Sequence, residues 1–475
     1  MSDFKVSRVL AQKVWDKLNT SAVPIVDANA FSNMPTIIDD LNDRIKSNQY
    51  LPDNVHGFLG LSKSLGVSRF IPIINHTDMA VYYQLCGEIG DRVIENMDGV
   101  FGGWQVVPTP ASRASLGNLP RKDQVTLLYD HEYFSETFSL ASWFQNYKSF
   151  TDCIEEITSS TEYGNYVGMT DIANFYDTID IDMLMSKLEQ RVPDLEHHLD
   201  LLKVYLNYWN RRLVGYKRSN KGIPQEIISD GSRNLAHFYL HKFDRKIIDY
   251  CKPLGVKFVR WADDMLFFGA SPQRIESCLY EASRLLLIEG LNLSAPKTEI
   301  LSRSEFRDYR CLGLLQAVAD GNDSEFVRQL EITRRKQNKG ERIKFDTAFR
   351  AALTYIKRKP HLRSAKNLSY VENSLKRHPE VFTSLSSNQL LSSVVIFKDP
   401  SSRLDELKNM ANRKPMSGPK AYLLKLIRDE AKNLLTAGVP KSQLHSIINE
   451  VGRSSSESEL LQKFCIPHTR QSLGP

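Results

Sequence analysis

Two short acidic segments carry the residue types with the clearest chemistry in this chain of 475 residues. Asp171 follows the strand-like run 166–170, and Asp263 and Asp264 stand between two further runs of apolar and aromatic residues. Ionised carboxylates at the ends of buried runs are costly unless a cation compensates them. Such carboxylates favour a site for hard divalent cations, which activate a hydroxyl nucleophile and stabilise a departing oxygen in nucleotidyl transfer. A lone Asp-Asp pair would more often be a solvated turn, so the interpretation depends on the elements around it.

These acidic residues meet only if the runs that flank them form one sheet. Asp263 and Asp264 separate two strand-like runs by about two residues, which predicts a β-hairpin with the carboxylates in its turn. If the strand that ends at Asp171 pairs beside this hairpin, all three residues converge at one sheet edge. Strands alternating with helices predict an α/β or α+β sheet domain. The strand-like runs are 166–170, 257–261 and 265–269, and the helix-like runs are 181–188 and 274–289.

Composition sets the broad class of protein. With 41% hydrophobic residues, the chain is long enough for two or three domains with cores of their own. The six cysteines lie far apart and form no CxxC pair, which argues against a zinc ribbon or a disulfide framework and for a reducing compartment. The start of the chain lacks the apolar stretch of a signal peptide, and no run is long enough to span a membrane. We therefore expect a soluble, cytoplasmic protein that does not bind membranes.

The positive charge is concentrated in one segment. Residues 331–380 contain 14 Lys and Arg against 5 Asp and Glu, an excess larger than the net charge of +6 of the whole chain. Such a segment could bind a polyanion by releasing the counterions of its phosphates, or it could be a solvated helical face. The candidate nucleic-acid-binding residues are Arg334, Arg335, Lys336, Lys357, Arg358 and Lys359.

The pattern divides the chain into three regions: 1–150, 151–318 and 319–475. The first combines helices at 6–18 and 79–97 with irregular connections such as 101–104, and the second holds the sheet. After the polar break at 320–323 the pattern becomes helical, including a helix at 420–435. The last twenty residues are rich in serine, and we expect them to be frayed.

Five motifs in a fixed order resemble those of the reverse transcriptases. Asp171 followed by Tyr176 is similar to the first motif of the family's palm domain, and Trp261-Ala262-Asp263-Asp264 is similar to its catalytic hairpin. The other three resemble the template- and primer-positioning motif, the motif that ends in a lysine, and the hydrophobic primer grip. They are Gly222-Ile223-Pro224-Gln225, the segment from Gly290 to Lys297, and Cys311-Leu312-Gly313-Leu314.

The resemblance implies an α+β fold of fingers and palm, with a ferredoxin-like palm sheet, followed by an all-α C-terminal domain. It implies that Asp171, Asp263 and Asp264 bind two Mg²⁺ ions, for which Mn²⁺ could substitute. Lys297 would act on the pyrophosphate leaving group. The substrate-binding residues would be Tyr176 as the gate against ribose 2′-hydroxyls, Gln225 at the template or incoming base, and Arg69 or Lys63 at the triphosphate, unless these last two are exposed loop cations.

A compact palm before a long helical region resembles the bacterial antiphage reverse transcriptases of the abortive-infection and "unknown group" kinds. The resemblance implies an RNA-directed DNA polymerase in the bacterial cytoplasm that uses deoxynucleotides and works with a structured noncoding RNA. Synthesis without a template, or from a protein primer, and assembly into homo-oligomers stay open. The alternatives are a catalytically silent RNA-binding scaffold and the reverse transcriptase of a mobile element or retron. The pattern does not identify the template, the primer or the product.

Overall fold

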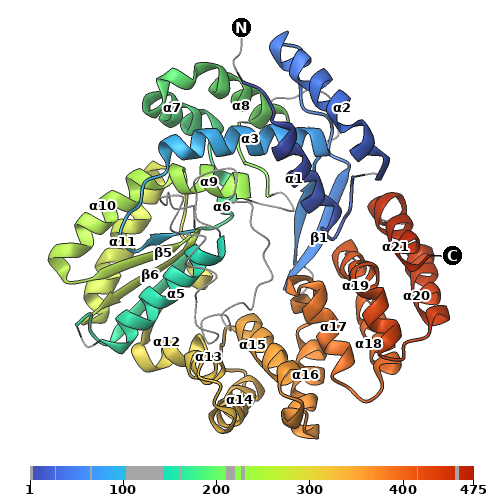
Figure 1. Ribbon diagram of the computed structural model, residues 1–475. Coiled ribbons are helices and arrows are strands. Elements are labelled where there is room, and N and C mark those ends of the chain that lie inside the picture. Colours follow the sequence, from blue (N-terminus) through green and yellow to red (C-terminus); the bar gives the residue numbers. More distant parts are fainter. Residues whose placement is uncertain are drawn as a thin grey trace.

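The fold is described from a computed structural model for residues 4–26, 28–64, 67–102, 143–160, 162–209, 220–225, 230–413, 416–454 and 459–474. It combines a five-stranded sheet and a separate two-stranded hairpin with many helices, so the expected α+β class is confirmed. In Figure 1 the elements follow one another around a ring, and the first helices lie beside the last ones. No helix of the described residues is long and apolar enough to cross a membrane.

The five-stranded sheet has the strand order β3-β5-β6-β4-β7. The short edge strand β3 runs parallel to β5, and the other neighbours are antiparallel. Strands β5 and β6 form the hairpin that the sequence predicts. The strands are β3 (Val100–Phe101), β4 (Tyr166–Asp171), β5 (Lys257–Trp261), β6 (Asp264–Gly269) and β7 (Glu299–Ser302).

Helices cover both faces of this sheet, and the side chains of β6 show why. Met265 and Phe267 belong to the main core, whereas Leu266 and Phe268 belong to a second cluster on the opposite face. This alternation follows from the two-residue period of a strand. The helices of this region are α5 (Trp143–Ser159), α6 (Phe175–Thr178), α7 (Ile181–Arg191), α8 (Glu196–Tyr208), α9 (Asp230–Tyr239), α10 (His241–Cys251), α11 (Pro272–Ile288), α12 (Arg303–Tyr309) and α13 (Leu312–Ala319).

Strand β3 lies where we expected an irregular connection, so that part of the interpretation of 101–104 was wrong. Two residues suffice for a strand here because they pair with the end of β5, and the amide of Ala262 also donates to the carbonyl of Phe101 at 3.2 Å. Gly102 has φ +99°, and a Cβ atom there would lie 2.2 Å from the nitrogen of Ala262. Only glycine allows this approach to the β5–β6 hairpin. Residues 103 and 104 lie outside the described part.

The N-terminal region contains three helices and a β-hairpin. The predicted helices at 6–18 and 79–97 are confirmed with slightly shifted ends. The antiparallel pair β1–β2 stands apart from the five-stranded sheet and contacts the C-terminal helix α19. The elements are α1 (Arg8–Asn19), α2 (Ala28–Lys46), β1 (Gly57–Ser64), β2 (Val67–Ile73) and α3 (His76–Val93).

The C-terminal region is helical in its described residues, as predicted. Asn322 in the predicted break caps the first of these helices by accepting from the amide of Glu325 at 3.1 Å. One hydrophobic cluster extends from Phe4 to Leu473 and so passes through all three predicted regions. The helices are α14 (Asp323–Asn338), α15 (Phe345–Arg358), α16 (Ala365–Arg377), α17 (Ser387–Val395), α18 (Pro400–Asn412), α19 (Ser417–Thr436), α20 (Lys441–Ser454) and α21 (Ile466–Leu473).

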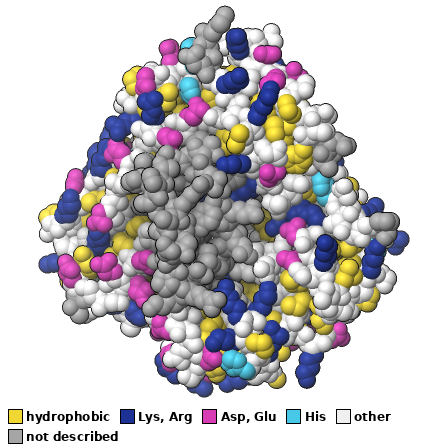
Figure 2. Space-filling view, viewed as in Figure 1, with side chains coloured by type: hydrophobic (Ala, Val, Ile, Leu, Met, Phe, Trp, Pro, Cys, Tyr) yellow, Lys and Arg dark blue, Asp and Glu magenta, His cyan; other side chains and the backbone are white. Residues whose placement is uncertain are grey.

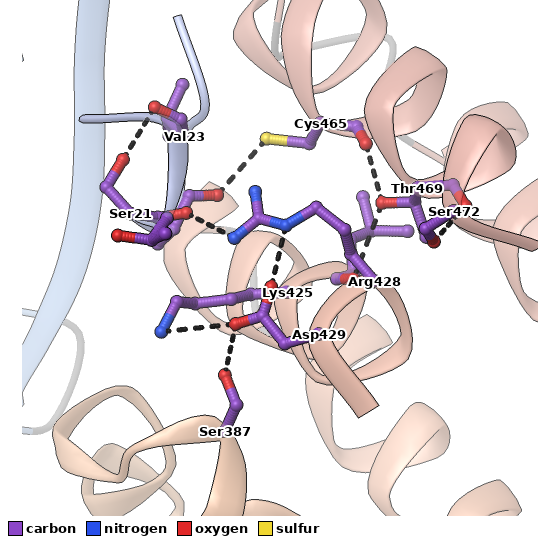
Figure 3. A network of polar contacts seen from close by, with 12 residues as sticks. Ser21, Val23, Ser387, Lys425, Arg428, Asp429, Cys465, Thr469 and Ser472 are labelled. Carbon is purple, nitrogen blue, oxygen red and sulfur yellow. Dashed lines mark hydrogen bonds and ion pairs between the residues drawn. The ribbon is translucent and has the colours of Figure 1, made fainter. Parts of the chain in front are cut away.

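The ring closes where the C-terminal helices meet the segment after α1 (Figure 3). Arg428 donates to the carbonyl of Ser21 at 2.9 Å, and the thiol of Cys465 lies 3.5 Å from the carbonyl of Ala22. The carboxylate of Asp429 also accepts from Arg428, at 2.8 Å. The expectation of a frayed end was therefore wrong for residues 459–474, because α21 buries apolar side chains against this junction and α19.

Candidate active site

Backbone pairing brings the acidic segments together. In the register between β4 and β6, Asp171 stands directly opposite Asp264. The amide of Ile172 donates to the carbonyl of Asp263 at 3.2 Å, which continues the pairing past the end of β4. All three aspartates therefore lie at one sheet edge, as the strand and hairpin patterns predict.

A buried ion pair supports the turn of the hairpin. Arg260 of β5 and Asp244 of α10 are both fully buried, and the guanidinium donates two hydrogen bonds to the carboxylate at 2.7 and 2.5 Å. Arg260 also donates to the carbonyl of Ala262 at 2.7 Å. Ala262 has φ +52°, a conformation that costs energy for a residue with a side chain. The ion pair thus holds the strained residue immediately before Asp263.

The segment from Gly290 to Lys297 joins the same edge. The amide of Ser294 donates to the carbonyl of Asp171 at 2.7 Å, and the short 3₁₀ helix η4 (Ala295–Lys297) follows. The ammonium of Lys297 forms an ion pair with the Asp171 carboxylate. Burial would lower the pKa of Lys297, but the nearby carboxylates outweigh it and raise the pKa. Lys297 therefore places a positive charge at the sheet edge formed by Asp171, Asp263 and Asp264, which we call the acidic edge.

The three carboxylates repel one another. Burial, followed by the charges of Asp264 and Asp171, raises the pKa of Asp263 to about 7. A second ammonium, that of Lys344 in the loop before α15, lies 3.4 Å from the Asp264 carboxylate. Two lysines from different segments thus supply positive charge to this edge.

The acidic edge fits a divalent cation by its donor atoms. Carboxylate oxygens are the ligands that Mg²⁺ prefers, and Asp171 Oδ1 is buried without a hydrogen-bond partner. Within the described part of the chain, however, no three His, Cys, Asp or Glu side chains are already arranged to hold a metal ion. In this structure the ammonium groups of Lys297 and Lys344 lie against Asp171 and Asp264 instead.

The structure places the predicted sugar gate beside the predicted template motif. Tyr176 lies in α6, half-buried against the core, after Asn174 in a left-handed conformation. The amide of Ile223 donates to the carbonyl of Tyr176 at 2.9 Å. This contact fixes the segment that carries Gln225, which is itself half-buried. Tyr176 and Gln225, which we assigned to substrate binding, therefore lie in one region although they are far apart in the sequence.

The candidate triphosphate ligands lie on the β1–β2 hairpin. Arg69 of β2 is exposed, and no side chain in the described part of the chain forms an ion pair with it. The backbone of Lys63 belongs to β1, but its side chain lies outside the described residues. The structure does not bring Arg69 into contact with the aspartates.

Several of the predicted nucleic-acid-binding cations have acidic partners. Arg334 and Arg335 of α14 pair with Glu331, and Lys336 pairs with Asp308. Lys359 pairs with Asp323, Lys357 donates to Asn388, and Arg358 is exposed. Surface ion pairs of this kind are weak and exchange readily. Figure 2 shows Lys and Arg side chains gathered below the centre of one face, over α15.

Comparison with known proteins agrees with this geometry. Residues 126–331 match the family described as reverse transcriptase (RNA-dependent DNA polymerase). This segment of the chain is therefore similar to the reverse transcriptases. The matched segment contains β4, the β5–β6 hairpin and the segment of Lys297, and so it includes the whole acidic edge.

One curated relative and one solved structure extend the comparison. The reverse transcriptase of retron Ec83 from Escherichia coli is 24% identical over 187 residues, which are 37% of this chain and 54% of the retron protein. The chain thus spans about half the length of this relative. A structure of telomerase from Candida albicans with a TWJ fragment of telomeric RNA has a TM-score of 0.28 and 11% identity, over 92% of this chain and 75% of that one. At that level of similarity it supports no inference about this protein.

Two features of the site were not predicted from the sequence. Arg260 interrupts an apolar run, which signals a buried charge, but nothing in the pattern identifies Asp244 as its partner. Lys344 lies in a basic segment among many similar residues, and its contact with Asp264 depends on how α13, α14 and α15 pack.

Proposed function

We propose that the chain is a DNA polymerase of the reverse transcriptase type, which adds deoxynucleotides to a primer at the edge formed by Asp171, Asp263 and Asp264. The observation that carries this proposal is the register of β4 and β6, which sets Asp171 opposite Asp264. Repulsive carboxylates at one sheet edge have no stabilising role of their own, but they suit a reaction that needs divalent cations.

Asp171, Asp263 and Asp264 would hold two Mg²⁺ ions. When bound, such ions supply the positive charge that activates the attacking hydroxyl and stabilises the leaving oxygen. Lys297 keeps its ammonium charged beside Asp171 and is more than half exposed, so it can turn toward a pyrophosphate and neutralise it. The buried Arg260–Asp244 pair orients the hairpin.

The region around α6 and the β1–β2 hairpin would select the substrate. We assign Tyr176 to the exclusion of ribose 2′-hydroxyls and Gln225 to the template or incoming base. Arg69 or Lys63 would bind the triphosphate, which requires the hairpin and the acidic edge to approach one another when the substrate binds. The basic C-terminal helices would hold the nucleic acid by its backbone.

The protein would act in the bacterial cytoplasm with a structured noncoding RNA, as part of a defence against phages. Support comes from the similarity to a retron reverse transcriptase and from the helical, basic region that follows the palm. Sequencing of nucleic acids that copurify with the protein would identify the template, the primer and the product together. A phage challenge of cells that carry wild-type or inactive protein would test the defence role.

Incorporation of labelled deoxynucleotides by the purified protein tests the activity directly. The double variant Asp263→Ala/Asp264→Ala should abolish it, whereas Asp39→Ala, which removes an exposed carboxylate on α2, should not. Equal incorporation by the double variant would contradict the proposal. Absence of incorporation by the wild-type protein on RNA, DNA and primer-free substrates, with RNA binding retained, would favour a silent RNA-binding scaffold.

A further inference from the structure

A polar pocket lies between α14 and α16, away from the acidic edge. Its volume is about 100 Å³, on a scale where a single water needs about 10–15 Å³. The lining contains two arginines, three amides and two hydroxyls, and no carboxylate. The residues are Arg334, Gln337, Asn338, Tyr370, Asn373, Ser374 and Arg377.

The pocket presents hydrogen-bond donors that the described protein atoms do not satisfy. Arg334 Nε and Gln337 Nε2 are buried and have no acceptor, although such donors are nearly always paired in folded proteins. The other end of Arg334 pairs with Glu331 at 2.9 Å. Burial raises the pKa of Tyr370, so its hydroxyl keeps its proton and can also donate.

This lining selects an anion with several acceptor oxygens. A guanidinium presents a planar set of donors that matches a phosphate, and amide and hydroxyl donors complete its coordination. Tyr370 is the single aromatic side chain in the lining and is buried, so the pocket offers no exposed face on which a base could stack. The lining therefore fits a phosphate group rather than a whole nucleotide.

A chain of contacts connects the pocket to the acidic edge. Arg377 at the rim is exposed and donates to Asn338 at 2.6 Å. The next residue, His378, packs its ring against Phe345 with centroids 4.2 Å apart. Phe345 follows Lys344, whose ammonium contacts Asp264. These contacts link the pocket to the candidate active site. The pocket itself lies within the basic segment 331–380.

We propose that this pocket holds one backbone phosphate of the nucleic acid on which the polymerase acts. The inference rests on the proposed function only for the identity of that nucleic acid. Arg377 is free to move from Asn338 to the incoming phosphate at the rim, and Arg334 and Gln337 would receive it inside. Binding of one phosphate in the pocket would set the position of the nucleic-acid strand relative to the β5–β6 hairpin.

Binding of a fluorescein-labelled single-stranded oligonucleotide, measured by anisotropy at several salt concentrations, tests the proposal. The variant Gln337→Leu/Arg377→Gln removes one inner and one rim donor without touching the Arg334–Glu331 pair. We expect its affinity to fall about tenfold and the slope of log K against log salt to decrease by about one. The matched control Lys376→Gln removes one exposed charge of the same helix, α16, outside the lining of the pocket. Equal affinities for the double variant and the control would overturn the proposal.

A second measurement locates the phosphate. A series of oligonucleotides, each with one neutral methylphosphonate, should show selective weakening at one position with the wild-type protein and none with the double variant. Weakening spread evenly over all positions would contradict a seated phosphate. Stabilisation of the wild type by inorganic phosphate in a thermal shift assay, without any effect of the variant on oligonucleotide binding, would show a small-anion pocket and overturn the proposal.

Failure of the inference can be told apart from failure of the proposed function. Asp263→Ala/Asp264→Ala should bind the oligonucleotide as the wild type does while losing incorporation. If the wild-type protein incorporates no nucleotides but the pocket variant still weakens binding, the function is wrong and the phosphate site stands. If incorporation is intact and the pocket variant binds normally, the site is wrong and the function stands.

Discussion

Replacing Asp244 with alanine is expected to destabilise the protein and to slow nucleotide addition. The exposed fraction of both Asp244 and Arg260 is 0%, so the variant would leave a buried guanidinium charge whose remaining acceptor is the carbonyl of Ala262. Breaking a buried ion pair by removing one partner costs about 3–5 kcal/mol. We expect the free energy of unfolding to fall by about that amount.

Urea unfolding followed by circular dichroism and tryptophan fluorescence would measure this loss. Asp249→Ala is the matched control, because Asp249 lies on the same helix, α10, and its pair with Lys252 is more than 70% exposed on both sides. That variant should unfold close to the wild type, since exposed pairs contribute little. A loss below about 1 kcal/mol in Asp244→Ala would refute the reasoning about the buried pair.

A double variant separates stability from positioning. Asp244→Leu/Arg260→Met replaces the ion pair with apolar side chains of similar size, which is often neutral for stability. The carbonyl of Ala262 would still lose its guanidinium donor, so nucleotide incorporation should stay below the wild-type level. Full activity in this variant would show that Arg260 does not position the hairpin.

Four further outcomes are expected. Tyr176→Ala should admit ribonucleotides in a competition between labelled dNTP and NTP, and unchanged discrimination would remove Tyr176 from the role of sugar gate. Gly168→Ala should lower the stability by about 1–3 kcal/mol in urea, because its Cβ would lie 2.4 Å from Ile275 Cγ2, and Ile275→Ala should partly rescue it. Burial, assisted by Arg260, lowers the pKa of His241 to about 3, whereas the unfolded side chain titrates near pH 6.5. The unfolded state therefore binds the proton first, stability should fall as the pH drops from 6.5 toward 3, and His241→Phe should flatten that fall; parallel curves would contradict it. Lys344→Met removes a positive charge that lies 3.4 Å from Asp264, so half-maximal incorporation should need less Mg²⁺, and an increased requirement would assign Lys344 to substrate binding instead.

Local pattern predicted β4, β5 and β6, because apolar residues run through these strands, but it did not predict the short edge strands β3 and β7. The run from Met265 to Phe268 is apolar throughout since each face of the sheet has its own core, and the acids follow where these runs end. The hairpin and its carboxylates could therefore be located from the sequence. The helices α3 and α19 were also predicted to within a few residues of their ends.

Contacts between distant segments could not be predicted in this way. The packing of α10 on the sheet determines that Asp244 pairs with Arg260. The packing of the helices after α13 brings Lys344 close to Asp264. The prediction of a frayed C-terminal end, where α21 lies, was wrong for the same reason. The apolar residues of this helix, Ile466 and Leu473, are few and dispersed, and they become buried only because the ring provides a surface for them.

Closure of the ring also has a consequence for the order of folding. The contacts of Ser21 with Arg428 and of Ala22 with Cys465 join residues 407 and 443 positions apart in the chain. During synthesis, the segment after α1 can therefore form these contacts only when almost the whole protein has left the ribosome. Because nascent chains fold from the N-terminus and distant contacts form slowly, we expect the palm to be complete before the first and last helices meet.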